Sequence, residues 1–95
     1  MALKILLVDD EVNLVEPMAY TLKQKGFETA IATNGQQALK MFELEEPDLI
    51  LLDWSMPDIS GIEVLKHIRD NKNVIPVIMV TGHNLFFFLS SYKSE

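Results

Sequence analysis

The sequence contains no cysteine, few basic residues and no long apolar run, and each absence excludes a class of protein. Without cysteine the chain cannot form a disulfide scaffold, a zinc-finger cage or a thiol nucleophile. Its 8 basic residues against 14 acidic ones give a net charge of −6, which argues against direct binding to nucleic acid. The apolar stretch near the N-terminus is too short to span a membrane, and it lacks a secretory cleavage site. We therefore expect a soluble, cytoplasmic protein with no membrane partner.

What is present is the composition of an ordinary small globular domain. The 95 residues are 48% hydrophobic and 23% charged, values at which disorder is not expected. A chain of this length buries roughly 60–65% of its unfolded surface, which is enough for one core. We expect one domain over residues 1–84, followed by an atypical apolar tail over residues 85–95.

Four apolar runs alternate with segments of helical periodicity. The first and third runs are nearly continuous, which is typical of parallel strands covered on both faces. The segments between the runs repeat apolar residues at helical spacing. The order βαβαβαβ predicts an α/β protein with a parallel sheet and right-handed crossovers. The four runs are Leu3–Val8, Phe27–Ala32, Leu49–Asp53 and Val74–Thr81.

The apolar run Leu85–Leu89 does not continue this alternation. As a helix it would form a stripe of Leu85, Phe88, Leu89 and Tyr92 and would leave Phe86 and Phe87 facing elsewhere. As a strand it has no helix before it to make a further parallel crossover. We therefore expect the sheet to end at the fourth strand.

Acidic residues follow two of the predicted strands. Asp9, Asp10 and Glu11 come after the first, Asp53 closes the third, and Thr81 closes the fourth. Open parallel sheets bind ligands outside the carboxyl ends of their strands. Clustered carboxylates repel one another, and a hard cation such as Mg²⁺ relieves that repulsion. The alternatives are that the first run caps the following helix and that Thr81 is a β-branched strand end.

Asp53 favours a functional site, because a carboxylate that ends a wholly apolar strand is costly without a partner. It is followed by Met56-Pro57 and then by Gly61. Together with the acidic pair, the apolar strand at residues 76–80 and the terminal threonine, these motifs resemble the receiver domains of two-component response regulators. The resemblance covers residues 1–83. It implies a flavodoxin-like, doubly wound sheet with strand order 2-1-3-4-5.

The resemblance also implies a role for each site residue. Asp53 would be the phosphoacceptor, taking a phosphoryl group from a histidine kinase or a phosphotransfer protein. Asp10, Asp53 and the backbone carbonyl of Ser55 would bind Mg²⁺ directly, and Asp9 would bind it through water. Thr81 would hydrogen-bond the phosphoryl group.

The chain departs from the family after the fourth strand. A complete receiver has five strands and five helices, and the sequence resembles one truncated after strand four. The family's functional lysine has no counterpart, since the role does not transfer to Lys93, the only lysine after Thr81. Without the final helix and strand, one sheet face and the edge of strand four would be uncovered. We therefore expect a homo-oligomer formed through strand four and the tail.

Three functions follow as hypotheses. The first is a phosphoacceptor receiver that is not a turnover enzyme. The alternative is a non-switching receiver fragment that acts only as a self-associating interaction module. The third is a hydrolase with an aspartyl-phosphate intermediate, similar to haloacid-dehalogenase-like phosphatases. It fits poorly, because those enzymes carry a second aspartate two residues after the nucleophile and Ser55 stands there.

Overall fold

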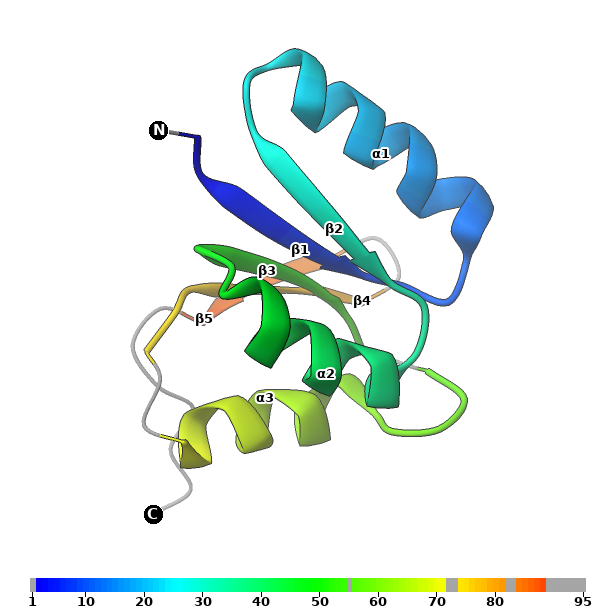
Figure 1. The fold of residues 1–95 in the computed structure, drawn as a ribbon. Helices are drawn as coiled ribbons and strands as arrows, with labels where there is room; N and C mark the ends of the chain where they lie inside the picture. The colour runs from blue at the N-terminus through cyan, green and yellow to red at the C-terminus, as the bar shows by residue number, and fades with distance from the viewer. Residues whose placement is uncertain (1, 55, 72–73, 82–83, 89–95) are drawn as a thin grey trace.

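The computed structural model describes residues 2–54, 56–71, 74–81 and 84–88, with Thr81 and residues 84–88 described by their backbone. Helices and strands alternate along the chain until the last strand. Figure 1 shows one sheet with α1 on one face and with α2 and α3 on the other. No helix in the described ranges is long and apolar enough to cross a membrane. The elements are β1 (Lys4–Val8), α1 (Val12–Gln24), β2 (Glu28–Ala32), α2 (Gly35–Glu45), β3 (Leu49–Asp53), α3 (Gly61–Asp70), β4 (Val77–Thr81) and β5 (Asn84–Phe88).

The sheet has the order β2-β1-β3-β4-β5. Its first four strands are parallel, which confirms the predicted doubly wound α/β fold. Val8 at the end of β1 pairs with Ala32 of β2 and with Leu52 of β3. Asp53 at the end of β3 pairs with Val80 of β4. The carboxyl ends of these four strands therefore share one edge of the sheet.

The prediction that the fourth strand has an open edge is wrong. β5 pairs antiparallel with β4, with Thr81 opposite Asn84 and Val77 opposite Phe88. An antiparallel neighbour needs only a short connection, so it requires no crossover helix. The apolar and aromatic residues of β5 also favour extended backbone. The backbone of β4 is thus paired on both sides, which removes the predicted route of self-association through its edge.

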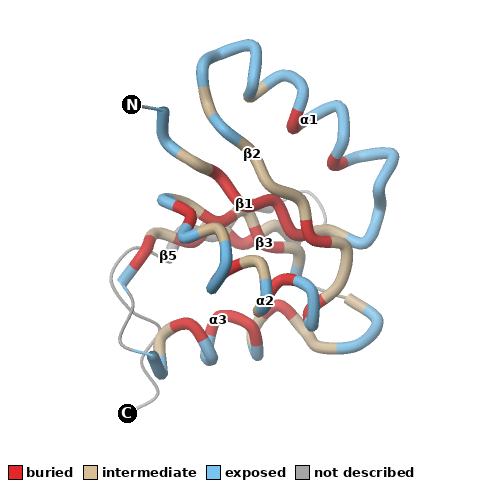
Figure 2. The backbone as a smooth tube through the Cα atoms, viewed as in Figure 1, coloured by how far each residue is buried: buried red, intermediate tan, exposed pale blue. Residues whose placement is uncertain are grey.

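The larger core lies between the sheet and the helices α2 and α3. Side chains alternate along β3, so that Ile50 and Leu52 face this core and are 0% exposed. Figure 2 shows buried residues following the inner sides of α2 and α3. This core positions the loop that follows β3. Its buried members are Leu6, Val8, Ala32, Ala38, Phe42, Ile50, Leu52, Val64, Leu65, Ile68, Ile75, Val77 and Met79.

The core under α1 is smaller. It contains Ile5 and Leu7 of β1 and Val15 and Ala19 of α1 as its buried members. On this side the apolar residues of β3 and β4 are only partly buried. The sequence prediction that residues 49–53 are covered on both faces therefore holds for one face of the described structure.

Candidate metal centre

Two neighbouring strands bring three aspartates to one edge of the sheet. β1 and β3 are adjacent and parallel, and Val8 lies opposite Leu52. Asp9 and Asp53 follow these residues at the same level. The chain crosses from β1 to β2 in one direction and from β3 to β4 in the other. This edge is therefore the switch point at which open α/β sheets bind ligands.

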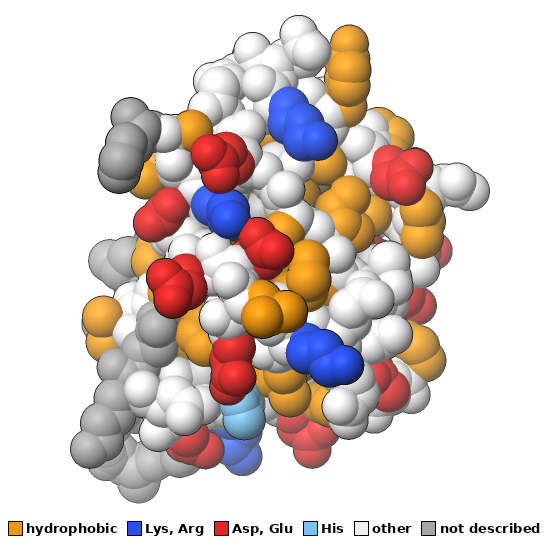
Figure 3. All heavy atoms as spheres, viewed as in Figure 1, with side chains coloured by type: hydrophobic (Ala, Val, Ile, Leu, Met, Phe, Trp, Pro, Cys, Tyr) orange, Lys and Arg blue, Asp and Glu red, His pale blue; other side chains and the backbone are white. Residues whose placement is uncertain are grey.

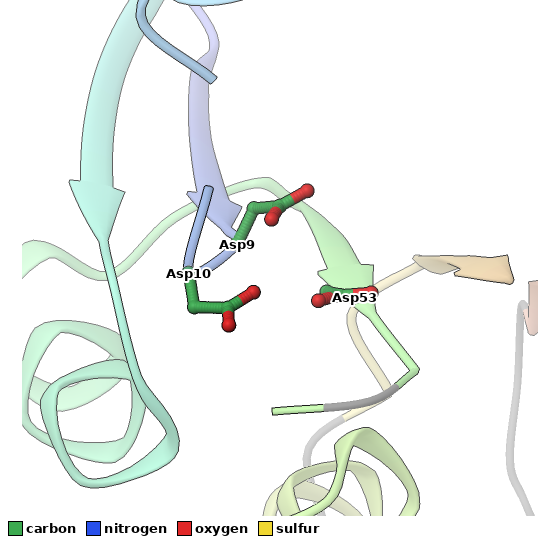
Figure 4. A group of neighbouring side chains, drawn as sticks. All are labelled: Asp9, Asp10 and Asp53. Atoms are coloured by element: carbon green, nitrogen blue, oxygen red, sulfur yellow. The ribbon is translucent and has the colours of Figure 1, made fainter. Parts of the chain in front are cut away.

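The three carboxylates lie close enough to share one cation. One oxygen from each of Asp9, Asp10 and Asp53 can be chosen so that all three lie within 4.8 Å of one another. Figure 4 shows these side chains, from the ends of β1 and β3, around a common space. Asp9 and Asp53 are partly buried, whereas Asp10 is exposed. The geometry thus brings together the three aspartates that the sequence predicts to be the metal ligands.

The chemistry of these donors fits Mg²⁺. All three are carboxylates, and hard divalent cations prefer oxygen ligands. Three negative groups at this spacing repel one another, and a bound cation offsets that repulsion. Mg²⁺ is usually held by one or two carboxylates and keeps several waters. The carboxyl ends of β1 and β3 suit it, because Asp10 is exposed to solvent there.

Helix capping does not account for this cluster. Glu11 occupies the N-cap position of α1, and its side chain makes no capping hydrogen bond. Asp9 Oδ1 accepts a hydrogen bond from the Glu11 backbone N–H at 2.9 Å, one residue before the helix begins. That bond shapes the turn between β1 and α1. Asp53 belongs to a strand, and the N-cap residues of the three described helices are Glu11, Asn34 and Ser60.

The loop after β3 folds back onto Asp53. The Gly61 N–H donates to the Trp54 carbonyl at 2.8 Å. A Cβ on Gly61 would overlap the carbonyl oxygen of Asp53, so only glycine fits at this position. Ser60 caps the helix that starts there, because its Oγ accepts the Glu63 N–H at 3.3 Å. The first turn of α3 therefore rests against the backbone of the third aspartate.

Sequence reasoning missed one residue near the site, Asp58. Its carboxylate accepts the N–H of Gly35 at 2.8 Å and the N–H of Gln36 at 2.9 Å. These bonds, to Gln36 first and Gly35 second, hold the pKa of Asp58 below its ordinary value of 3.8. The partners are more than twenty residues away, so no local spacing could have revealed them. The one available signal is a carboxylate in the loop after β3, and the sequence does not identify its partners.

The remaining predicted site residues are described in part or not at all. β4 places Thr81 at the same edge, one residue beyond the pairing of Asp53 with Val80. Its hydroxyl is a side-chain group and is not described. Ser55 and Lys93 lie outside the described residues. The predicted roles of Ser55 and of the Thr81 hydroxyl remain predictions, and no role was predicted for Lys93.

Two apolar hollows lie on the α1 side of the sheet. One of about 90 Å³ adjoins the candidate metal centre, and one of about 340 Å³ lies toward the other end of the strands. Residues of β1, β3 and β4 line both hollows. The first is lined by Leu7, Val8, Asp9, Leu14, Val15, Met18, Leu51, Asp53 and Val80. The second is lined by Leu3, Ile5, Phe27, Asp48, Leu49, Pro76 and Ile78.

Curated relatives share most of this chain. It is 44% identical over 79 residues to the alkaline phosphatase synthesis transcriptional regulatory protein PhoP of Bacillus subtilis, covering 83% of this chain and 33% of that protein. It is 47% identical over 80 residues to the phosphate regulon transcriptional regulatory protein PhoB of Pseudomonas aeruginosa, covering 82% and 35%. The chain thus spans about a third of the length of these relatives.

Solved structures agree with this similarity. The response regulator protein TrrA of Thermotoga maritima, crystallised in complex with Mg²⁺–BeF, is 41% identical with a TM-score of 0.80, covering 86% of this chain and 71% of that one. A CheY-like response regulator receiver domain protein of Methanospirillum hungatei is 31% identical with a TM-score of 0.83, covering 88% and 67%. The family described as the response regulator receiver domain matches residues 5–91. The chain therefore belongs to the response regulator receiver domain family.

Proposed function

We propose that this chain is the phosphoacceptor of a two-component system and receives a phosphoryl group on Asp53. The observation that carries the proposal is the convergence of three carboxylates within 4.8 Å at the switch point of the sheet. The donor would be a histidine kinase or a phosphotransfer protein, as the family implies. Similarity to a response regulator crystallised with Mg²⁺–BeF supports the same assignment.

Asp53 would act as the nucleophile. A carboxylate oxygen would bond to phosphorus while the bond from phosphorus to the donor's histidine nitrogen breaks. The electron pair of that bond stays with the nitrogen, which takes a proton from water. Asp53 ends a strand, and the Trp54 N–H that follows it donates to the Val80 carbonyl at 2.9 Å. The nucleophile is thus held on a rigid element. Since the product is a modified chain, the protein is not a turnover enzyme.

Asp10 and Asp53 would hold Mg²⁺ directly, with the Ser55 backbone carbonyl as a further ligand. Asp9 would act through a water, which fits the bond that one of its oxygens already accepts from Glu11. When bound, Mg²⁺ offsets the negative charge on the equatorial oxygens of the transferring group. Thr81 would donate a hydrogen bond to the phosphoryl group once it is attached.

The charge of the chain fits a protein partner better than nucleic acid. Acidic side chains predominate over basic ones on the face seen in Figure 3, with apolar groups between them. Such a surface releases few counterions from a phosphate backbone. We therefore propose no direct nucleic-acid contact for this chain. The regulatory activities in the names of PhoP and PhoB belong to longer proteins, of which the match covers 33% and 35%.

Phosphoramidate tests the proposal, because its phosphorus–nitrogen bond imitates phosphohistidine. With Mg²⁺ present, intact-mass spectrometry should show one added phosphoryl group on the wild type. Asp53→Asn should remain unmodified, and Asp10→Asn should react more slowly because it loses a metal ligand. Asp70→Asn, at the far end of α3, is the matched control and should react like the wild type. Equal modification of Asp53→Asn would refute the assignment.

Self-association is the second candidate function. The apolar hollows and the exposed side chains Leu14 and Met18 of α1 adjoin on one face. In a symmetric pair, α1 of each copy could cover the exposed part of β3 and β4 in the other. This arrangement uses the face of the sheet, in place of the β4 edge predicted from the sequence.

Sedimentation tests this second candidate. The wild type should form a dimer at tens of micromolar, and Ile78→Glu, which puts a charge in the larger hollow, should be a monomer. Lys66 is an exposed residue of α3, on the other face of the sheet, and Lys66→Glu should leave the dimer intact. A monomeric wild type would exclude self-association without bearing on phosphorylation.

A further inference from the structure

The amino end of α2 has its backbone donors satisfied from two sources. The first N–H groups of a helix have no partner within the helix. Asn34, the N-cap residue, accepts the Gln37 N–H through Oδ1 at 2.8 Å. Asp58 accepts the two before it, from Gly35 and Gln36. One cap is therefore local, and the other comes from the loop after β3.

The loop after β3 packs directly on this helix end. A Cβ on Gly35 would lie 2.6 Å from the Cβ of Ile59, so the loop can approach closely only because residue 35 is glycine. Asp58 stands five positions after Asp53 and three before Gly61. The loop is thus held by Asp58 in its middle and by the bond from Gly61 to Trp54 at its ends.

We propose that Asp58 is a positioning residue for the candidate metal centre: by tying this loop to the amino end of α2, it fixes the backbone that leaves Asp53. The inference rests on the proposed function, since that function makes the loop backbone part of the site. An ionised carboxylate suits the task because it accepts two N–H bonds at once and because negative charge is favourable at a helix amino end. A side chain that merely capped α2 would affect stability alone.

The chain offers a matched control for this distinction. Asn34→Ala removes a side-chain cap from the same turn of α2 but leaves the tie to the loop. Asp58→Ala removes the tie. Both variants should lower the midpoint of urea unfolding. Only Asp58→Ala should also weaken Mg²⁺ binding, by up to about 10-fold, the lower end of the range for residues that orient metal ligands.

Mg²⁺ affinity can be read from the fluorescence of Trp54, which directly follows Asp53. Both affinities are measured without urea, where both variants are folded. A weaker affinity in Asp58→Ala than in Asn34→Ala would then support the positioning role. Equal affinities in the two variants would overturn it. Asp58→Asn, which keeps one acceptor oxygen, should bind Mg²⁺ with an intermediate affinity, and an affinity as low as that of Asp58→Ala would count against a role for the remaining bond.

The readout separates the inference from the proposed function. Phosphoramidate labelling of the wild type tests the phosphoacceptor assignment and does not involve Asp58. If Mg²⁺ binds and the variants differ as expected, the positioning role holds even where labelling fails. If labelling succeeds and the variants bind Mg²⁺ equally, the assignment holds and the positioning role falls. A wild type that binds no Mg²⁺ would overturn the positioning role.

Discussion

The two faces of the sheet differ in how far the described residues cover them. On the α2 and α3 side, apolar residues of β1, β3 and β4 are buried together with both helices. On the α1 side, burial is complete only for Ile5 and Leu7 of β1, and the outward residues of β3 and β4 stay partly exposed. The candidate metal centre lies where these faces meet. One face thus supports the site, and the other leaves apolar surface beside it.

The helices differ in the same way. α2 and α3 begin at the caps Asn34 and Ser60. α1 begins at Glu11 with no side-chain cap, and it contains Pro17, which removes a hydrogen bond from the helix interior. It buries only Val15 and Ala19. The structural support of the loop after Asp53 therefore comes from α2 and α3, while α1 is the least anchored element among the three helices described.

Replacing one leucine on each face should have the largest effect. Leu65 of α3 is 0% exposed, so Leu65→Ala should lower the free energy of unfolding by about 3 kcal/mol, as buried leucines do. Leu51 of β3 is partly exposed on the α1 side, and Leu51→Ala should cost about 1 kcal/mol. Urea unfolding at low micromolar concentration measures both. Equal losses would show that the α1 face is covered in solution.

Gly61→Ala should have the next largest effect, and it acts at the covered face. The added Cβ would overlap the Asp53 carbonyl oxygen, so the backbone must shift, at a cost of about 2 kcal/mol. Mg²⁺ affinity should fall as well, because the shift displaces Asp53. Ile62→Ala is the matched control, since it removes core contacts from the same turn of α3. A loss of stability in both variants with Mg²⁺ affinity unchanged in both would contradict the link between Gly61 and the site.

The parallel sheet and the acidic edge could be predicted from the sequence because they depend on local patterns. Apolar runs separated by helical periods define β1 to β4, and Asp9, Asp10 and Asp53 stand at the ends of such runs. Parallel strands then bring these ends together without further information. The position of the metal ligands thus follows from which residues end the strands.

Two features depend on contacts that no local pattern encodes. β5 was missed because the sequence was interpreted with parallel crossovers alone, and an antiparallel strand needs no helix before it. Asp58 was missed because its partners at residues 35 and 36 belong to a different helix. The exposure of Leu49 and Leu51 was missed for a third reason: an apolar strand shows that it tolerates burial on both faces, and it does not show that both faces are covered.

Removing a helix cap should have a smaller effect that depends on the helix. Ser60→Ala deletes the bond to the Glu63 N–H and should lower the free energy of unfolding by about 1 kcal/mol. Glu11→Ala should leave the free energy of unfolding nearly unchanged, because the Glu11 side chain makes no capping bond to α1. Thermal unfolding followed by circular dichroism compares the two variants. A larger loss of unfolding free energy for Glu11→Ala than for Ser60→Ala would contradict the view that α3 is capped more firmly than α1.

The smallest effect should be a dependence on acid pH that arises on the α2 and α3 side. The N–H groups of Gln36 and Gly35 hold the pKa of Asp58 below 3.8, its ordinary value. A group with a lowered pKa in the folded state stabilises the fold above its unfolded-state pKa, and this contribution is lost as the pH falls through the folded value. Asp58→Asn cannot titrate. The stability difference between wild type and Asp58→Asn should therefore shrink between about pH 5 and pH 3, as measured by urea unfolding at each pH. A difference that stays constant over this range would show that the two backbone bonds do not depend on the charge of Asp58.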